Sequence, residues 1–268
     1  MTGDNPYSRT GPSPFQAPDW QPRLPKGMRV LVAGASGGLG SALVNMILAG
    51  SEDVIVGAHG GSRAPGYEDG QVIPLVQAFE GPDDCQQLVD DFATRAGGID
   101  ALVCLTGAIH ATGHWKDMAG TDWQNEIEIN LNQPFYLARA GLEAMRAQGT
   151  GGRILLNGTE SALHGGSPVS FPYAIAKRGT ECMVQGLARE GAPLGVLVNG
   201  LRFGYIASGF HQRWHSKTPE DMAARADLVP LKRGGDPEEA AALMCYLLSD
   251  WSRFITGQMF ALTGGDWL

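Results

Sequence analysis

Tyr173 and Lys177 are the most informative pair of reactive side chains in this sequence. They are four positions apart in a segment of helical periodicity, 173–190, so the phenol and the ammonium would share one face of a helix. A phenol with a pKa of about 10 is a poor acid or base at neutral pH, but a neighbouring cation stabilises its phenolate. The spacing is that of a general acid–base pair, and the alternative is a half-buried tyrosine packed against a solvated lysine.

A glycine cluster follows the first β-rich segment, 29–32, and reads Gly34-Ala35-Ser36-Gly37-Gly38-Leu39-Gly40. A strand-to-helix turn uses one glycine to turn tightly, a second to let a pyrophosphate approach the backbone and a third for close packing of the helix on the strand. The helix N-terminus then offers free N–H groups and a favourable dipole to the phosphates. The placement predicts a dinucleotide site formed by Gly34, Ser36, Gly38, Leu39 and Gly40, although glycines also mark ordinary turns.

Segments of strand character alternate with segments of helical periodicity along most of the chain. We expect strands over 29–32, 54–56, 72–76, 101–105, 154–156, 196–199 and 258–262, and helices from Leu39 and over 85–96, 123–146, 173–190 and 238–248. Pro134 is expected to bend the long helix 123–146. Such alternation predicts an α/β fold with a single doubly wound parallel sheet and helices on both faces.

Residues 1–27 differ from the rest of the sequence. This stretch is polar and is punctuated by Pro6, Pro12, Pro14, Pro18, Pro22 and Pro25. Proline fixes φ and removes a backbone donor, so we expect 1–27 to be an extended or disordered N-terminal arm. No change of composition divides residues 28–268, which we expect to form one domain.

Composition excludes several classes of partner. The chain has 28 acidic and 20 basic residues and a net charge of −8, which disfavours binding to nucleic acid or an anionic membrane and suits a small-molecule substrate. No apolar stretch approaches the roughly 20 residues that span a bilayer. The four cysteines form no CxxC pair, no histidine spacing indicates a metal site, and no secretory signal opens the chain. We expect a cytoplasmic protein.

The C-terminal part carries a further pattern. It runs Pro230-Leu231-Lys232-Arg233-Gly234-Gly235-Asp236-Pro237-Glu238-Glu239, then Leu247-Leu248-Ser249-Asp250, Ile255-Thr256-Gly257-Gln258 and Thr263-Gly264-Gly265. With the GxxxGxG spacing of the glycine cluster and the YxxxK pair, residues 28–268 resemble the short-chain dehydrogenase/reductase family, in particular its 3-oxoacyl-ACP-reductase-like members. The resemblance implies a Rossmann-like domain, an NAD(P)-dependent interconversion of a ketone and a secondary alcohol, and a homodimer or homotetramer.

The resemblance also implies roles for individual residues. Tyr173 would exchange a proton with the substrate oxygen, and Lys177 would lower the tyrosine pKa and bind the nicotinamide ribose. Asn130 matches the family's helix asparagine, which holds a water of the proton relay; otherwise it is a polar helix residue facing a neighbour. Gly107 would let the cofactor approach. The segment from Phe203 to Ser208 resembles the family's Pro-Gly-x-x-x-Thr segment and would place Gly204, Ile206 and Ser208 at the nicotinamide, with Phe203 in place of the proline.

The family's substrate-orienting serine has no unambiguous counterpart. Thr159 occupies the position when the match is made from the preceding strand, Glu160 when it is counted back from Tyr173, and Ser161 is one residue further. A hydroxyl is needed there, so we favour Thr159 with a one-residue loop insertion and place Ser161 second. Glu160 at this position would indicate an altered or inactive site. The divergence leaves two alternatives, a dehydratase or epimerase and a non-catalytic binding or assembly protein of the same fold.

The second predicted strand bears on the choice of nicotinamide cofactor. NAD-preferring relatives carry an acid at its end, where this chain has Ala58. Ser62 and Arg63 follow, and a guanidinium matches phosphate geometry, which favours NADP(H) over NAD. Segments 110–115, 163–171 and 205–229 are expected around an apolar or cyclic substrate, with the last as a loop that closes over it.

Overall fold

The computed structural model describes residues 22–266 of the chain. Most of the predicted N-terminal arm, residues 1–21, therefore lies outside the described residues. The described remainder of that arm contacts the domain, because Leu24 is buried and its N–H donates to Ser51 Oγ at 3.0 Å. Along the described chain, no helix combines the length and the apolar character that a bilayer-crossing segment needs.

Seven strands form one sheet in the order β3-β2-β1-β4-β5-β6-β7, and every pairing is parallel. The strands are β1 (Arg29–Ala33), β2 (Ile55–Gly60), β3 (Val72–Val76), β4 (Ala101–Cys104), β5 (Gly152–Thr159), β6 (Val196–Phe203) and β7 (Met259–Leu262). Strands β1 and β4 consist almost entirely of apolar residues, as a sheet covered on both faces requires; all four residues of β4 are buried. The predicted doubly wound parallel sheet is confirmed.

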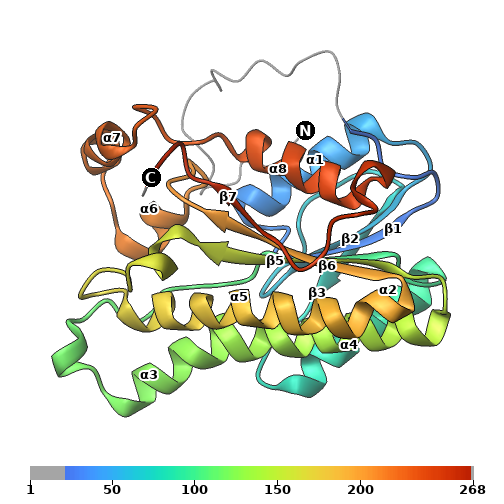
Figure 1. The fold of residues 1–268 in the computed structure, drawn as a ribbon, viewed down its shortest axis with the longest axis horizontal. Helices are drawn as coiled ribbons and strands as arrows, with labels where there is room; N and C mark the ends of the chain where they lie inside the picture. Colours follow the sequence, from blue (N-terminus) through green and yellow to red (C-terminus); the bar gives the residue numbers. More distant parts are fainter. Residues whose placement is uncertain (1–21, 267–268) are drawn as a thin grey trace.

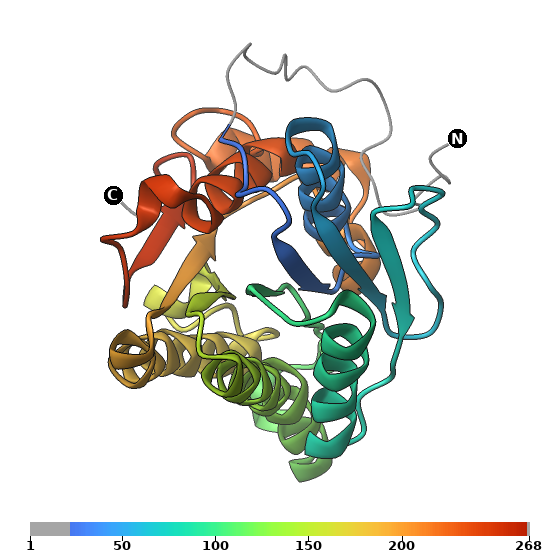
Figure 2. The same cartoon turned by 90° about the vertical axis from the view of Figure 1, so that its right-hand side faces the viewer.

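Helices cover both faces of the sheet (Figures 1 and 2). They are α1 (Gly38–Gly50), α2 (Pro82–Ala96), α3 (Gly120–Ile127), α4 (Gln133–Gln148), α5 (Phe171–Gly191), α6 (Phe210–His215), α7 (Pro219–Leu228) and α8 (Pro237–Leu248). Apolar side chains of α1 and α8 pack on one face, and those of α2, α4 and α5 pack on the other. The predicted helices 85–96, 173–190 and 238–248 each begin one to three residues earlier, at a proline-containing first turn.

The predicted long helix 123–146 lies within an unbroken helical stretch from Gly120 to Gln148. It consists of α3, then a π-helical turn over Glu128–Asn132, then α4. The irregular turn, and not a simple bend, directly precedes Pro134, which lies in the first turn of α4. Asn130 lies in the π-turn, and insertions of this kind concentrate at functional sites.

The segment 205–229 is also more ordered than a closing loop. It contains α6 and α7, and α7 begins with a capping box in which Thr218 and Asp221 satisfy each other's backbone donors. Met222 and Val229 form a small apolar cluster with Tyr205. The two helices lie at the end of the sheet to which the strands point (Figure 1).

Candidate active site

The predicted site residues gather at the carboxyl ends of the central strands, where the strand order reverses between β1 and β4. The glycine loop follows β1, residues 105–107 follow β4, and Thr159 ends β5. Leu105 N–H donates to Ala33 O at 2.8 Å, which joins the first two of these segments. Open α/β sheets bind their ligands at such a reversal.

Tyr173 and Lys177 share one face of the first turns of α5. The Tyr173 side chain is buried, and Lys177 has no exposed surface. The Lys177 ammonium lies 5.9 Å from the centre of the Tyr173 ring, donates to Asn157 Oδ1 at 2.9 Å and reaches Thr106 O at 3.4 Å. The lysine is therefore held by acceptors on β5 and after β4, and the solvated lysine of the alternative interpretation does not occur.

Burial sets the protonation of this pair. Desolvation raises the pKa of Tyr173, the negative charge of Glu126 raises it further, and a hydrogen bond with Thr159 opposes the shift. Desolvation lowers the pKa of Lys177 to about 8, against the effect of Cys104. At neutral pH the phenol is protonated and the lysine carries its charge, which is the combination of a proton donor with a cation that stabilises the resulting phenolate.

The structure separates the three candidates for the hydroxyl position. A side-chain interaction with Thr159 opposes the rise in the pKa of Tyr173, and Ser161 Oγ lies 3.0 Å from Thr159 Oγ1. The Glu160 carboxylate is buried and lies 3.7 Å from the Arg202 guanidinium of β6. These contacts favour Thr159 for the hydroxyl position, with the Ser161 hydroxyl beside it.

Asn130 is fully buried and fixed to the segment after β4. Its Oδ1 accepts from Ala108 N–H at 3.1 Å, and its Nδ2 donates to Ala108 O at 2.8 Å. Gly107 lies beside it with φ of 156°, and a Cβ there would lie 3.1 Å from Asn130 Oδ1 and 3.4 Å from Lys177 Nζ. A side chain at position 107 would fill the space between these two groups.

Two residues of this group were not predicted from the sequence. Asn157, the acceptor for Lys177, is two residues before Thr159 on the same strand, so the two side chains lie on one face of β5. Glu126 is four residues before Asn130 and binds its amide at 3.1 Å. Strand and helix periodicity, applied outward from Thr159 and Asn130, would have found both.

The glycine loop has the close contacts that a pyrophosphate site requires. Gly34 has φ of 91°, and a Cβ on Gly38 would lie 2.2 Å from Ser208 O. A Cβ on Gly40 would lie 2.3 Å from Gly34 O, and Leu39 packs against the apolar core. Ser36 lies within this turn, just before α1. The first turn of α1 carries no acidic residue, so its N–H groups and dipole suit the phosphates of a dinucleotide.

The segment 204–208 adjoins this loop as predicted. A Cβ on Gly204 would lie 2.8 Å from Thr263 Cα, and Ile206 is buried and pairs as an isolated bridge with Gly235. The buried Ser208 is thereby brought against Gly38, from the opposite end of the chain. The glycine loop and the segment 204–208, which would bind the phosphates and the nicotinamide, thus form one continuous surface that extends to Lys177 and Tyr173.

Arg63 lies three residues after the end of β2 and is exposed. Within β2, His59 Nδ1 accepts from the Gly34 N–H of the glycine loop at 3.3 Å, and its Nε2 lies 2.8 Å from Gln77 O. Burial lowers the pKa of His59, and Phe79 stacks on its ring at 4.9 Å. The end of β2 therefore presents a neutral imidazole and an apolar ring.

One aromatic ring packs beside Tyr173, and a second aromatic pair joins two of the segments expected around the substrate. Phe210 of α6 packs 6.0 Å from the Tyr173 ring, and Trp214 contacts His110 edge-on at 4.9 Å. Trp115 N–H donates to Pro168 O at 3.0 Å, which joins the segments 110–115 and 163–171. The three segments expected around the substrate therefore meet.

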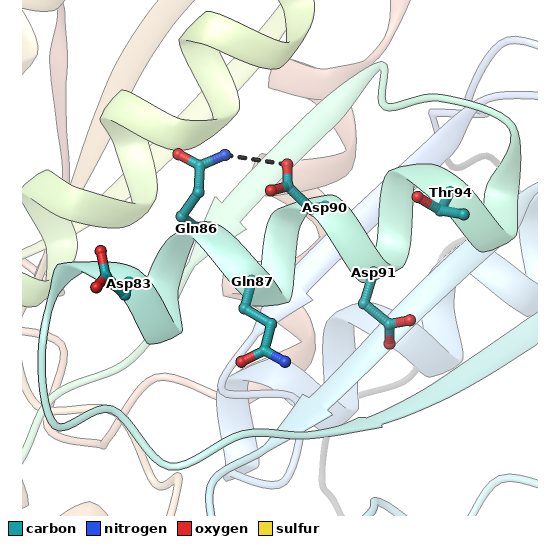
Figure 3. A pocket seen from close by; sticks show the side chains of 6 residues that line it. All are labelled: Asp83, Gln86, Gln87, Asp90, Asp91 and Thr94. Carbon is teal, nitrogen blue, oxygen red and sulfur yellow. Dashed lines mark hydrogen bonds between the residues drawn. The ribbon is translucent and has the colours of Figure 1, made fainter.

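Two surface hollows lie outside the surface formed by the glycine loop and the segment 204–208. One, of about 270 Å³, is bordered by His110 and by Ala111, Thr112, Gly113, Asp117, Met118, Asp122 and Asn125, behind the 110–111 backbone. The other lies on the outer side of α2, and all its lining residues come from that one helix (Figure 3). Neither contains Tyr173 or Lys177.

Comparison with known proteins agrees with this geometry. The family model described as enoyl-(acyl carrier protein) reductase matches residues 71–266. A 3-oxoacyl-[acyl-carrier-protein] reductase of Rickettsia conorii is 30% identical, over 89% of this chain and 96% of that protein. A putative ketoacyl reductase of a monensin polyketide synthase from Streptomyces virginiae is 31% identical, over 88% of this chain and 95% of that protein.

A solved structure leads to the same family. A short-chain type dehydrogenase/reductase from Mycobacterium marinum superimposes with a TM-score of 0.81 at 27% identity, over 90% of this chain and 95% of that chain. The sheet order, the glycine loop and these relatives agree with one another. The chain therefore belongs to the short-chain dehydrogenase/reductase family and is an NAD(P)-dependent oxidoreductase.

Proposed function

We propose that this enzyme reduces a ketone to a secondary alcohol with NADPH, and that Tyr173 donates the proton. The observation that carries the proposal is the buried Tyr173 side chain with the Lys177 ammonium 5.9 Å from its ring, and with the Thr159 side chain among the groups that set the pKa of the phenol. A protonated phenol beside a hydroxyl and a cation suits a carbonyl oxygen that gains negative charge during reduction.

The chain's own residues have distinct tasks in this proposal. The Thr159 hydroxyl donates to the carbonyl oxygen and holds it against the phenol. Tyr173 transfers its proton to that oxygen, and Lys177 stabilises the phenolate left behind. Asn130 and Asn157 fix the polar groups around the lysine, while NADPH supplies the hydride that reaches the carbonyl carbon. The reverse reaction uses the same groups with Tyr173 as the base.

The surroundings of β2 support NADP(H) over NAD. The strand ends in Ala58, His59 and Gly60, without a carboxylate that would accept from a ribose hydroxyl and repel a 2′-phosphate. Arg63 follows in an exposed position, and a guanidinium binds phosphate in a bidentate manner. We propose that Arg63, with Ser62 beside it, binds the 2′-phosphate.

Arg63→Ala is expected to raise the Kd for NADPH by about 10-fold or more, the loss of one charge-assisted hydrogen bond, and to leave the Kd for NADH unchanged. Energy transfer from the protein's tryptophans to the reduced nicotinamide measures both constants. Arg189→Ala, a change at an exposed arginine of α5, serves as the matched control. An equal loss for both nucleotides would remove Arg63 from phosphate recognition.

The substrate is proposed to be an apolar, cyclic or 3-oxoacyl ketone. Phe210 beside Tyr173 and Trp214 beside His110 offer apolar walls, and two relatives carry names of 3-oxoacyl and ketoacyl reductases. We further propose a cytoplasmic homodimer or homotetramer, in keeping with the composition and the family.

The test of the proposed function is NADPH oxidation by the purified protein with acetoacetyl-coenzyme A, cyclohexanone and acetophenone. At least one of these ketones is expected to be consumed with one equivalent of NADPH and to yield the secondary alcohol. Product analysis completes the test, because a product formed with no net change in the nicotinamide would indicate a dehydratase or epimerase. NADPH binding without turnover of any carbonyl compound would support the non-catalytic alternative.

A further inference from the structure

Glu126 is a carboxylate buried in the catalytic centre. It lies in α3 and is 1% exposed. Its Oε1 accepts from His110 N–H at 2.6 Å and from Ala111 N–H at 2.8 Å, and its Oε2 accepts from Asn130 Nδ2 at 3.1 Å. Within residues 22–266, three N–H groups therefore donate to the two Glu126 oxygens and compensate the carboxylate charge.

Burial of the Glu126 carboxylate costs free energy of desolvation. An apolar side chain at a buried helix position would pack there without the desolvation of a carboxylate. What the carboxylate adds is geometry, because it joins three separate parts of the site: α3, the segment after β4 and the π-turn. Asn130 Nδ2 is shared between Glu126 and the backbone carbonyls of Ala108 and Glu126, so the amide has one orientation.

We propose that Glu126 is a positioning residue of this site, which holds the Asn130 amide and the 110–111 backbone in the arrangement from which Tyr173 transfers its proton. The inference rests on the proposed ketone reduction. It extends that function to Glu126, four positions before Asn130. Glu126 orients the Asn130 amide and also fixes the backbone of His110 on the substrate side.

The charge of Glu126 adds a second effect. The groups that act on the Tyr173 phenol are Glu126 from α3, Thr159 from β5 and Lys177 from α5, while Phe210 from α6 contacts the ring without charge. Burial and the Glu126 charge both raise the pKa of Tyr173. Removal of the charge therefore lowers this pKa, and the phenol would lose its proton, and with it the ability to act as an acid, at lower pH.

Glu126→Gln tests the proposal with almost no change in shape. Glutamine has one acceptor oxygen, so its amide must turn a donor either toward Asn130 or toward the 110–111 backbone. We expect kcat for ketone reduction to fall on the order of 10- to 100-fold, the cost of a misplaced reacting group, and the KM for NADPH to stay within about twofold.

The chain offers a close internal control. Glu128 accepts from Asn132 Nδ2 at 2.6 Å, the same glutamate-to-asparagine pairing at the same i,i+4 spacing, two residues further along and only partly buried. Glu128→Gln is expected to leave kcat, the pH profile and NADPH binding unchanged.

A substrate-independent measurement accompanies the kinetics. Hydrogen–deuterium exchange of the peptide that contains residues 108–111 is expected to speed up on the order of 10-fold in Glu126→Gln and to stay unchanged in Glu128→Gln. Should Glu126→Gln not fold, Glu126→Asp keeps both oxygens and the charge on a shorter side chain. That variant is expected to lower kcat and to keep the KM for NADPH within about twofold of wild type.

The outcomes separate this inference from the proposed function. If Tyr173→Phe is inactive while Glu126→Gln matches Glu128→Gln in rate and exchange, Glu126 has no positioning role and the ketone reduction stands. If Tyr173→Phe reduces ketones at the wild-type rate, Tyr173 is not the proton donor and the role of Glu126 is overturned with it. If the wild-type protein reduces none of the ketones, the proposed function itself is wrong.

Discussion

Tyr173→Phe is expected to lower the rate of ketone reduction by a factor of about 10² to 10⁴, the usual contribution of a positioned proton donor. The substitution removes one oxygen and keeps the ring, so the packing against Phe210 is retained. It also removes the hydroxyl that interacts with Thr159, and with it the proton itself. Steady-state rates with the best ketone measure the effect, and titration with NADPH is expected to give a Kd within about twofold of wild type.

Tyr246→Phe provides the control for this prediction. Tyr246 lies on α8 and packs against the apolar core beneath α1, on the face of the sheet opposite α5. Its variant loses the same hydroxyl and is expected to reduce ketones at the wild-type rate. Equal activity of the Tyr173 and Tyr246 variants would show that the phenol does not donate the proton.

Gly38→Ala is expected to weaken NADPH binding on the order of 100-fold and to destabilise the protein. The new Cβ would lie 2.2 Å from Ser208 O and 2.9 Å from both Ser208 C and Ser208 Cα, which are backbone atoms without a rotamer to change. Either α1 or the 204–208 segment must therefore shift, and a shift of this size at a positioned phosphate site costs that much. Overpacking of this kind costs about 1–3 kcal/mol of folding free energy.

Gly186→Ala is the matched control. Gly186 lies within α5, is exposed and has no atom within 4 Å of where a Cβ would be. The same chemical change is expected to stabilise the fold by about 0.5–1 kcal/mol, because glycine lowers helix stability. Nucleotide titration and thermal unfolding of both variants check the pair. NADPH affinity at the wild-type level in Gly38→Ala would contradict a pyrophosphate site at this loop.

The sequence was sufficient for the sheet and for the groups whose spacing has a direct physical reason. Buried parallel strands are continuous apolar runs, so β1, β4 and β6 stand out, and the glycines between β1 and α1 indicate a tight turn. Tyr173 and Lys177 follow helical spacing, and Thr159 was preferred because the site needs a hydroxyl. These inferences depend on neighbours in sequence, which a single chain displays.

Features that depend on distant parts of the chain were not accessible in this way. In the π-turn, the Asn130 side chain pairs with Ala108, a partner 22 residues away. Helix α7 has a capping box but a weak apolar face of one buried residue, so periodicity did not reveal it. Asn157 and Glu126 have ordinary residue types for a strand and a helix, and only their tertiary partners, Lys177 and the 110–111 backbone, give them a part in the site.

The short segment after β4, residues 105–107, contacts both the glycine loop and Lys177. A Cβ on Gly34 would lie 3.0 Å from the Leu105 carbonyl carbon, and the carbonyl of the next residue, Thr106, faces Lys177 Nζ at 3.4 Å. The backbone that touches the pyrophosphate loop is thus also part of the environment of the lysine. Binding at the loop and proton loss from Lys177 are therefore coupled equilibria, and linkage makes that coupling reciprocal. To whatever extent the dinucleotide changes the acidity of the lysine, the protonation of the lysine changes the affinity for the dinucleotide by the same factor.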